Sequence, residues 1–366
     1  MMKSIEILSG LAPKAPAAII LNTPHQRFLL DAGACIGTAD VPWSCPADID
    51  AVFISHDHVD HIGGIGQIPQ HIPVYCSAFV ASQLPDRENI HVLPVQGCTD
   101  IMGVTVRTGS AGHALGGIWF HFDIDGGVFY SGDFCFESEL FRFDLPPPAK
   151  VALLDMSYGN YDSPMNHQKV LFEEALTQHN KSGAVLLPVP ASGRGIEMAM
   201  WLATRYPAQV CIDRNGFRHI NQAMAQHDIG LQPEQQAQLK ALSESIRVIE
   251  HPSDIRSSDI ILAGSADLDC GLAKTLLDQK HDALQKIIFT GYMGPLVKAI
   301  YQQRPSRFIR WNVHPTFSDN ARLIRHLGCE TVIPLFHPDL SSLQTQLGDS
   351  KIHNHSYWSP FNATYA

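Results

Sequence analysis

The segment at residues 54–64, ISHDHVDHIGG, constrains this chain more than any other part of the sequence. It follows the apolar run AVF (51–53), which is typical of a buried strand, and it holds three histidines and two aspartates within six residues. If the chain turns here, His56 and His58 can converge on one cation, while Asp60 and His61 face a second. Imidazole and carboxylate suit zinc, and paired ions ~3.5–4 Å apart are a known hydrolytic arrangement. A polar turn exposed to solvent does not require so many histidines and aspartates. The segment therefore predicts a metal centre.

Hydrophobic patterning predicts two lobes in an α/β chain. Short apolar runs such as RFLLDAG and GVFYSGD alternate with turn residues up to about residue 130, which predicts sheets packed face to face with helices outside. After the hinge DLPPPAK (144–150), helices alternate with buried strands, as in a parallel sheet covered by helices. The pattern of short apolar strands returns near residue 309, where we expect a helix capped by Ser318. The expected divisions are residues 1–165 and 309–366 for one domain and 166–308 for an inserted domain.

Composition excludes several classes of protein. A chain of 366 residues with 45% apolar content can build two cores, since domains hold roughly 100–200 residues. The eight cysteines form no CxxC pair, which argues against a zinc ribbon and against a disulfide framework. No apolar run approaches the ~18 residues of a membrane span, and no signal peptide is recognisable, so we expect a cytoplasmic protein without a membrane partner.

The net charge of −10 argues against a nucleic-acid partner, because such proteins usually carry a basic surface. The charge is unevenly distributed, however. Residues 166–308 hold 15 Lys and Arg against 14 Asp and Glu, or +1, which leaves −11 on the remainder. The acidity therefore lies mainly in the part of the chain with the candidate metal ligands, where cations would offset it. The argument against nucleic acid is weakened but remains.

Three further motifs accompany the histidine segment, one before it and two after it. Asp31 closes RFLLDAG, His113 sits in SAGHALGG and Asp133 sits in FYSGDF. Together with HxHxDH, these motifs resemble the metallo-β-lactamase fold, a four-layer αββα sandwich. The resemblance implies one zinc ion on His56, His58 and His113, and a second on Asp60, His61 and a late histidine. It also implies that Asp133 bridges the two ions and that Asp31 braces the loop from behind.

The inserted part resembles the β-CASP branch of this family, which contains RNase J, the endonuclease of mRNA 3′-end processing and the Artemis-like enzymes. Four segments carry the resemblance, and it extends over nearly the whole chain. The chain departs from the branch in its short insert, in Asp155 at an acid-like position and in the lack of a further nucleic-acid-binding domain after the core. The segments are LLDMSYGNYD, LLPVPASGRGIEM (186–198), DIILAGSADLDCG (259–271) and IIFTGYMG (287–294).

The branch carries a histidine in FSAHAD and another in VHGE, and two placements of the first compete here. Asn320 lies 17 residues before His337, whereas His314 lies 23 before it, which leaves room for a capped helix and a strand. We therefore assign His314, in WNVHPT, to the FSAHAD position and His337, in PLFHPD, to the late zinc ligand. A structural loop histidine is the alternative for His314.

Two residues are candidates for substrate contact. Arg194 precedes an expected helix, where a guanidinium and backbone N–H groups can hold a phosphate. A surface arginine at a helix start is an equally good interpretation. Tyr158 can stack on a base or belong to the core.

The favoured function is a nuclease that hydrolyses RNA or DNA through a hydroxide shared by two zinc ions, although manganese or iron would suit the same ligands. We expect His314 to act as general acid, Asp155 to hold its tautomer, and Asp60 to serve the reaction as well as the metal. A small-molecule metallohydrolase for a thioester, lactone or cyclic nucleotide is the alternative, as is a non-catalytic subunit. The family also implies a homodimer as one oligomeric state.

Overall fold

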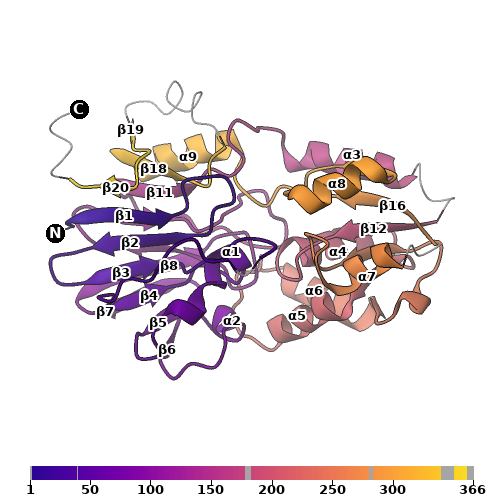
Figure 1. The fold of residues 1–366 in the computed structure, drawn as a ribbon, viewed down its shortest axis with the longest axis horizontal. Helices are drawn as coiled ribbons and strands as arrows, with labels where there is room; N and C mark the ends of the chain where they lie inside the picture. Colours follow the sequence, from indigo (N-terminus) through magenta and orange to yellow (C-terminus); the bar gives the residue numbers. More distant parts are fainter. Residues whose placement is uncertain (1, 39, 178–182, 280–282, 339–349, 361–366) are drawn as a thin grey trace.

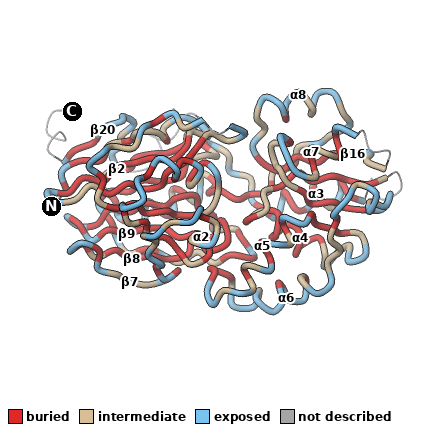
Figure 2. The backbone as a smooth tube through the Cα atoms, turned by 60° about the horizontal axis from the view of Figure 1, so that its bottom comes forward, coloured by how far each residue is buried: buried red, intermediate tan, exposed pale blue. Residues whose placement is uncertain are grey.

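A computed structural model describes residues 2–38, 40–177, 183–279, 283–338 and 350–360. The chain forms two lobes that lie side by side (Figure 1). One lobe holds two seven-stranded sheets and the other a six-stranded sheet. Buried backbone runs along the strands of both lobes, whereas the outer helices and loops carry the exposed residues (Figure 2).

The first sheet has the strand order β20-β1-β2-β3-β4-β5-β6. Its central strands β2 and β4 are fully buried, because both of their faces are covered. Strands β3, β4, β5 and β6 run parallel to one another, so their carboxyl ends meet at one edge of the sheet. The strands are β1 (Ser4–Ser9), β2 (Ala18–Asn22), β3 (Arg27–Leu30), β4 (Ala51–Phe53), β5 (Val74–Ser77), β6 (Ile90–Leu93) and β20 (Tyr357–Trp358).

The second sheet has the order β19-β18-β11-β10-β9-β8-β7. Strands β7 to β10 form an antiparallel meander, and β10, β11, β18 and β19 are parallel. The carboxyl ends of β10 and β11 therefore lie together, and a functional site is expected at such an edge. The strands are β7 (Gly97–Ile101), β8 (Val104–Ser110), β9 (Ile118–Phe122), β10 (Val128–Tyr130), β11 (Val151–Asp155), β18 (Thr331–Leu335) and β19 (Lys351–Ile352).

These two sheets pack face to face through an aromatic core. The ring of Phe53 in the first sheet lies 5.5 Å from Phe120 and 5.1 Å from Phe122 in the second, measured between centroids. Both contacts are edge-on, the geometry that aromatic pairs prefer. Short helices cover the outer face of the first sheet, and α9 covers that of the second. The expected αββα sandwich is confirmed. The helices are α1 (Val59–Ile62), η1 (Ile65–Gln67), α2 (Ala78–Ala81) and α9 (Phe317–Leu327).

The third sheet has the order β14-β13-β15-β12-β16-β17, and all of its strands are parallel. Helices α3 to α6 pack on one face and α7 and α8 on the other, as the alternating texture predicts. The strands are β12 (Ala184–Pro188), β13 (Val210–Asp213), β14 (Arg247–Ile249), β15 (Ile260–Ala263), β16 (Leu284–Phe289) and β17 (Ser306–Phe308). The helices are α3 (Met165–Thr177), α4 (Arg194–Ala203), α5 (Arg214–Met224), α6 (Gln235–Ser245), η2 (Pro252–Asp254), α7 (Gly271–Asp278) and α8 (Pro295–Gln303).

The chain enters this third sheet with α3 and leaves it with β17, so elements from both ends of the sequence build the sandwich. The α/β fold with an inserted α/β unit is thus confirmed, while the boundaries at 165/166 and 308/309 stay predictions.

The start of α9 corrects one sequence prediction. Thr316, not Ser318, caps the helix: its Oγ1 accepts the Asp319 N–H at 3.3 Å, and the Asp319 carboxylate accepts the Thr316 N–H at 3.1 Å. This reciprocal pair satisfies two backbone N–H groups. Ser318 lies inside the first turn, and its hydroxyl donates to Asp162 at 2.7 Å.

Within the described residues, no helix has the length and apolar character needed to span a lipid bilayer.

Candidate metal centre

The histidine segment begins where β4 ends and is held in place by backbone contacts. His56 and His58 lie on the turn, and Asp60 and His61 lie on the short helix α1. The Asp60 carbonyl accepts the Ala17 N–H at 2.8 Å and the His61 carbonyl accepts the Ala32 N–H at 2.8 Å. Gly33 permits this close approach, because a Cβ at that position would overlap the carbonyl oxygen of Asp60.

Asp31 lies behind the segment and holds it through hydrogen bonds. This fully buried carboxylate accepts hydrogen bonds from the Ser55 N–H and Oγ, both at 2.7 Å, and from the Tyr130 hydroxyl at 2.5 Å. It also lies 2.7 Å from His61 Nδ1. Because Nδ1 then carries the proton that is donated to Asp31, the Nε2 of His61 is free to act as a ligand.

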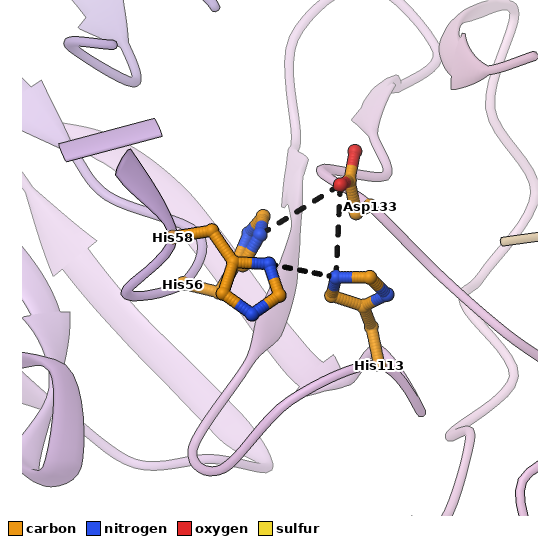
Figure 3. A group of neighbouring side chains, drawn as sticks. All are labelled: His56, His58, His113 and Asp133. Atoms are coloured by element: carbon orange, nitrogen blue, oxygen red, sulfur yellow. Dashed lines mark hydrogen bonds and ion pairs between the residues drawn. The ribbon is translucent and has the colours of Figure 1, made fainter. Parts of the chain in front are cut away.

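The clustered side chains form three overlapping groups, all of which contain Asp133. Figure 3 shows the first group, in which Asp133 Oδ2 lies 3.8 Å from His56 Nε2 and 3.6 Å from His113 Nε2, while His58 Nδ1 lies 3.1 Å from His113 Nε2. In the second, His61 Nε2 lies 3.3 Å from Asp133 Oδ1. The groups are His56, His58, His113 and Asp133; Asp60, His61 and Asp133; and Asp133, Asp155 and His314.

The chemistry of these groups fits divalent cations. Ligands ~2.0–2.1 Å from a tetrahedral zinc ion lie about 3.4 Å apart, close to the separations of 3.1–3.8 Å in the first group. The Nε2 atom of His56 and the Oδ1 of Asp133 are buried without a hydrogen-bond partner among the described residues. Buried polar atoms rarely stay unpaired, and bound cations would satisfy them.

The electrostatics of the cluster also favour metal binding. Burial lowers the pKa of His56, His58 and His113, so these imidazoles are neutral, the form that ligates metals. Burial opposes the charge on His61 too, but Asp133 and Asp31 outweigh it and hold its pKa well above its usual value, so His61 must lose the proton on Nε2 before it can bind a cation. Burial disfavours the charged form of Asp133, but His61 and His314 hold its pKa well below the ordinary value.

The His314 side chain lies at this cluster, whereas Asn320 lies in the first turn of α9. His314 Nδ1 lies 2.7 Å from Asp155 Oδ2 and 3.6 Å from Asp133 Oδ2. Asn320, the competing candidate, is buried and donates from Nδ2 to the backbone carbonyl of Asp155 at 3.1 Å. Its side chain therefore supports the strand end, as expected of a residue in the first turn of a helix.

Lys14 is a neighbour of the site that sequence reasoning missed. Its Nζ lies 3.4 Å from His314 Nε2, and it lines the same cavity. The residue has a positive φ of 55°, which turns the loop after β1 toward the cluster. No motif indicates this position, because a loop conformation brings it there.

His337 is the one predicted ligand that the structure does not bring into the three groups. The preceding residue, Phe336, has a φ of 57°, and its ring packs 5.6 Å from His61. His337 Nε2 instead lies 3.0 Å from Asn354 Oδ1. Its Nδ1 is buried and, among the described residues, has no hydrogen-bond partner. The role of His337 as a ligand stays a prediction.

A cavity of about 830 Å³ lies against the metal-ligand groups and reaches residues of both lobes. Both predicted substrate contacts, Arg194 and Tyr158, line it, as do His58, Asp60 and His314. The Tyr158 hydroxyl accepts the Val313 N–H at 3.1 Å and donates to the Trp311 carbonyl at 3.3 Å. The ring of Tyr158 thus lies between the substrate space and the segment that carries His314.

Residues 26–188 match the family described as the beta-lactamase superfamily domain. The matched residues form a domain of that superfamily. The expected resemblance to the β-CASP branch of the metallo-β-lactamase fold is confirmed by this match together with the relatives below.

Three relatives illustrate the similarity. The chain is 26% identical over 251 residues to the transcription termination factor FttA of Methanocaldococcus jannaschii, covering 55% of this chain and 39% of the relative. It is 24% identical over 231 residues to the endoribonuclease YSH1 of Candida glabrata, covering 50% and 30%. It is 32% identical over 227 residues to the uncharacterized protein sll0514 of Synechocystis, covering 54% and 40%. The chain thus spans two fifths or less of these relatives.

A solved structure shows the same fold. The crystal structure of a protein of unknown function from Enterococcus faecalis superposes with a TM-score of 0.66 at 12% identity, over 98% of this chain and 100% of the other.

Proposed function

We propose that this protein is a metal-dependent nuclease that hydrolyses phosphodiester bonds of RNA or DNA in the cavity between its lobes. The observation that carries the proposal is the pair of buried, unpartnered ligand atoms His56 Nε2 and Asp133 Oδ1, because Asp133 lines that cavity together with His58 and His113. The similarity to a protein named an endoribonuclease agrees with a nucleic-acid substrate. A cytoplasmic location and a homodimer stay predictions.

Seven residues would hold the cations: His56, His58, Asp60, His61, His113, Asp133 and, by prediction, His337. Zinc ions, or manganese or iron ions, would supply Lewis acidity that attracts phosphoryl oxygens and makes water acidic enough to act as a nucleophile near neutral pH. Asp31 would keep His61 oriented through the hydrogen bond to Nδ1. Asp60 would contribute both to metal binding and to the reaction.

His314 would protonate the oxygen that leaves when the phosphodiester bond breaks. Its Nδ1–H donates to Asp155 at 2.7 Å, which fixes the orientation of the ring. The proton on Nε2 would then face the cavity, on the side where Lys14 lies. Proton transfer of this kind needs a donor within hydrogen-bond reach of the departing oxygen, and the cavity wall provides that position.

A second candidate is a small-molecule metallohydrolase, because a volume of about 830 Å³ also suits a compact ligand. A substrate panel separates the two. The purified full chain, supplied with Zn²⁺ or Mn²⁺, is incubated with end-labelled single- and double-stranded RNA and DNA, and in parallel with a thioester, a lactone and a cyclic nucleotide. We expect cleavage of a nucleic acid. Turnover of the small molecules alone would contradict the proposal.

A further inference from the structure

Arg310 occupies an aromatic cradle on the wall of the cavity. Its guanidinium carbon lies 4.4 Å from the ring centroid of Tyr158, 4.6 Å from that of Tyr161 and 5.5 Å from that of Phe308. Cation–π attraction holds the group without neutralising its charge. Across the part of the chain that the structure describes, Arg310 makes no ion pair and no hydrogen bond through its side chain. Its donors are therefore available to a ligand.

Arg194 supplies a second guanidinium to the same cavity. It begins α4, and its Nε is buried without a hydrogen-bond partner among the described residues. The group lies against the backbone of Gly291, where a Cβ would overlap Arg194 Nη1. Burial lowers the pKa of Arg194; Tyr158 and Asp267 oppose that shift, and the positive charge of Arg310 adds to it. Both guanidinium groups line the same cavity.

Two guanidinium groups that line one cavity, neither of them in an ion pair with a carboxylate of the described residues, favour an anion between them. The planar, forked donors of arginine match phosphate oxygens and can bind them in pairs. The ring of Tyr158 connects this place to the reaction centre, because its other neighbour is the His314 ring at 5.2 Å, edge-on. Arg310 thus lies one aromatic ring away from the proposed proton donor.

We propose that Arg310 and Arg194 form a subsite for a phosphate of the substrate strand, adjacent to the phosphodiester bond that is cleaved. The inference rests on the proposed function and deepens it. It also changes the role expected of Tyr158: the ring is a platform for Arg310, not a surface on which a base stacks. Arg310 is a substrate-binding residue that no sequence motif indicates.

Binding of a hydrolysis-resistant strand tests the subsite independently of turnover. Fluorescence anisotropy measures the affinity of the metal-loaded full chain for labelled phosphorothioate RNA and DNA strands. In a matched series, a neutral methylphosphonate replaces one linkage at a time. The variants are Arg310→Gln, Arg310→Lys and a control, Arg322→Gln, whose arginine stacks on Phe136 at 5.1 Å outside the cavity.

We expect the wild-type protein to lose affinity about tenfold when one particular linkage is neutral, the scale of one charged hydrogen-bonded contact. Arg310→Gln should lose about the same factor on the fully charged strand and show no further loss at that linkage. Arg310→Lys should fall between, and Arg322→Gln should bind like the wild type.

The outcomes separate the subsite from the proposed function. Additive losses from Arg310→Gln and from every neutral linkage would overturn the subsite, even if the chain cleaves nucleic acid. The coupled pattern without any cleavage in the presence of metal would support the subsite and contradict the nuclease. Failure of the metal-loaded chain to bind any strand would overturn both.

Discussion

The Nδ1 of His314 lies 2.7 Å from Asp155 Oδ2, although 159 residues separate them in the chain. Asp155 ends the buried strand β11, and His314 follows β17 after the chain returns from the third sheet. The pair places an imidazole beside Asp133, at the edge where the predicted metal ligands gather. The proposed proton donor and the candidate metal ligands thus share one site.

Replacing His314 by Ala should lower kcat by ~10²–10⁴-fold, the usual contribution of a general acid, with little change in bound metal. Steady-state kinetics and metal analysis of the same preparation measure both quantities. His71→Ala, at an exposed histidine remote from the cluster, serves as the control. An unchanged rate, or a loss of metal together with the rate, would remove His314 from this role.

Asp31→Asn should weaken metal binding by about 10–100-fold, because an amide cannot accept all the hydrogen bonds that orient His61 and Ser55. Competition with a chromogenic chelator measures the affinity. Asp86→Asn, at an exposed aspartate, is the matched control and should bind metal normally. Equal affinities for the two variants would show that Asp31 does not position the ligands.

Gly33→Ala should reduce the free energy of unfolding by about 2–3 kcal/mol, because the new methyl group would overlap the Asp60 carbonyl oxygen and force the backbone apart. Gly66→Ala is the matched control, since a Cβ there meets no atom within 4 Å. Denaturant titration measures both. Equal free energies of unfolding for Gly33→Ala and Gly66→Ala would show that Gly33 and the Asp60 carbonyl do not pack closely.

His121 should make stability depend on pH. Burial lowers the pKa of this imidazole, whose Nε2 lies 3.0 Å from the Pro148 carbonyl and whose Nδ1 is buried without a hydrogen-bond partner among the described residues. Near pH 6.5 His121 therefore takes up a proton in the unfolded chain but stays neutral in the folded chain. Its contribution to stability is present above that pH and is lost as the pH falls.

The measurement compares unfolding free energies of the wild type and His121→Gln between pH 7 and 5, both loaded with metal. The wild type should lose up to about 1.4 kcal/mol more per pH unit than the variant. His71→Ala should not change the slope. Parallel pH profiles for the wild type and His121→Gln would refute the assignment.

Local motifs explain why much of the site could be predicted. His56, His58, Asp60 and His61 lie within one turn, so the order of residue types already indicates their convergence. The spacing argument also separates His314 from Asn320, since a helix and a strand must fit before residue 337.

The parts that could not be predicted depend on contacts between distant segments or on single backbone angles. Lys14 reaches His314 across 300 residues through a loop residue with positive φ, and Arg310 is defined by the tyrosines that hold it. Thr316 caps α9 because its hydroxyl and the Asp319 carboxylate each accept a backbone N–H of the other residue. The sequence alone does not distinguish Thr316 from the nearby Ser318 as the cap. The position of His337 depends on the left-handed turn at Phe336.

The most direct test of the account is a chelation and rescue experiment on strand cleavage. Cleavage of an end-labelled single strand by the full chain is followed with bound metal, after removal of the metal with a chelator, and after Zn²⁺ or Mn²⁺ is restored; the His58→Ala variant and the His71→Ala control are treated in the same way. The account predicts that cleavage stops with the chelator, returns with the metal, and is lost in His58→Ala but not in His71→Ala. Cleavage that persists through chelation, or that His58→Ala retains at the wild-type rate, would contradict it.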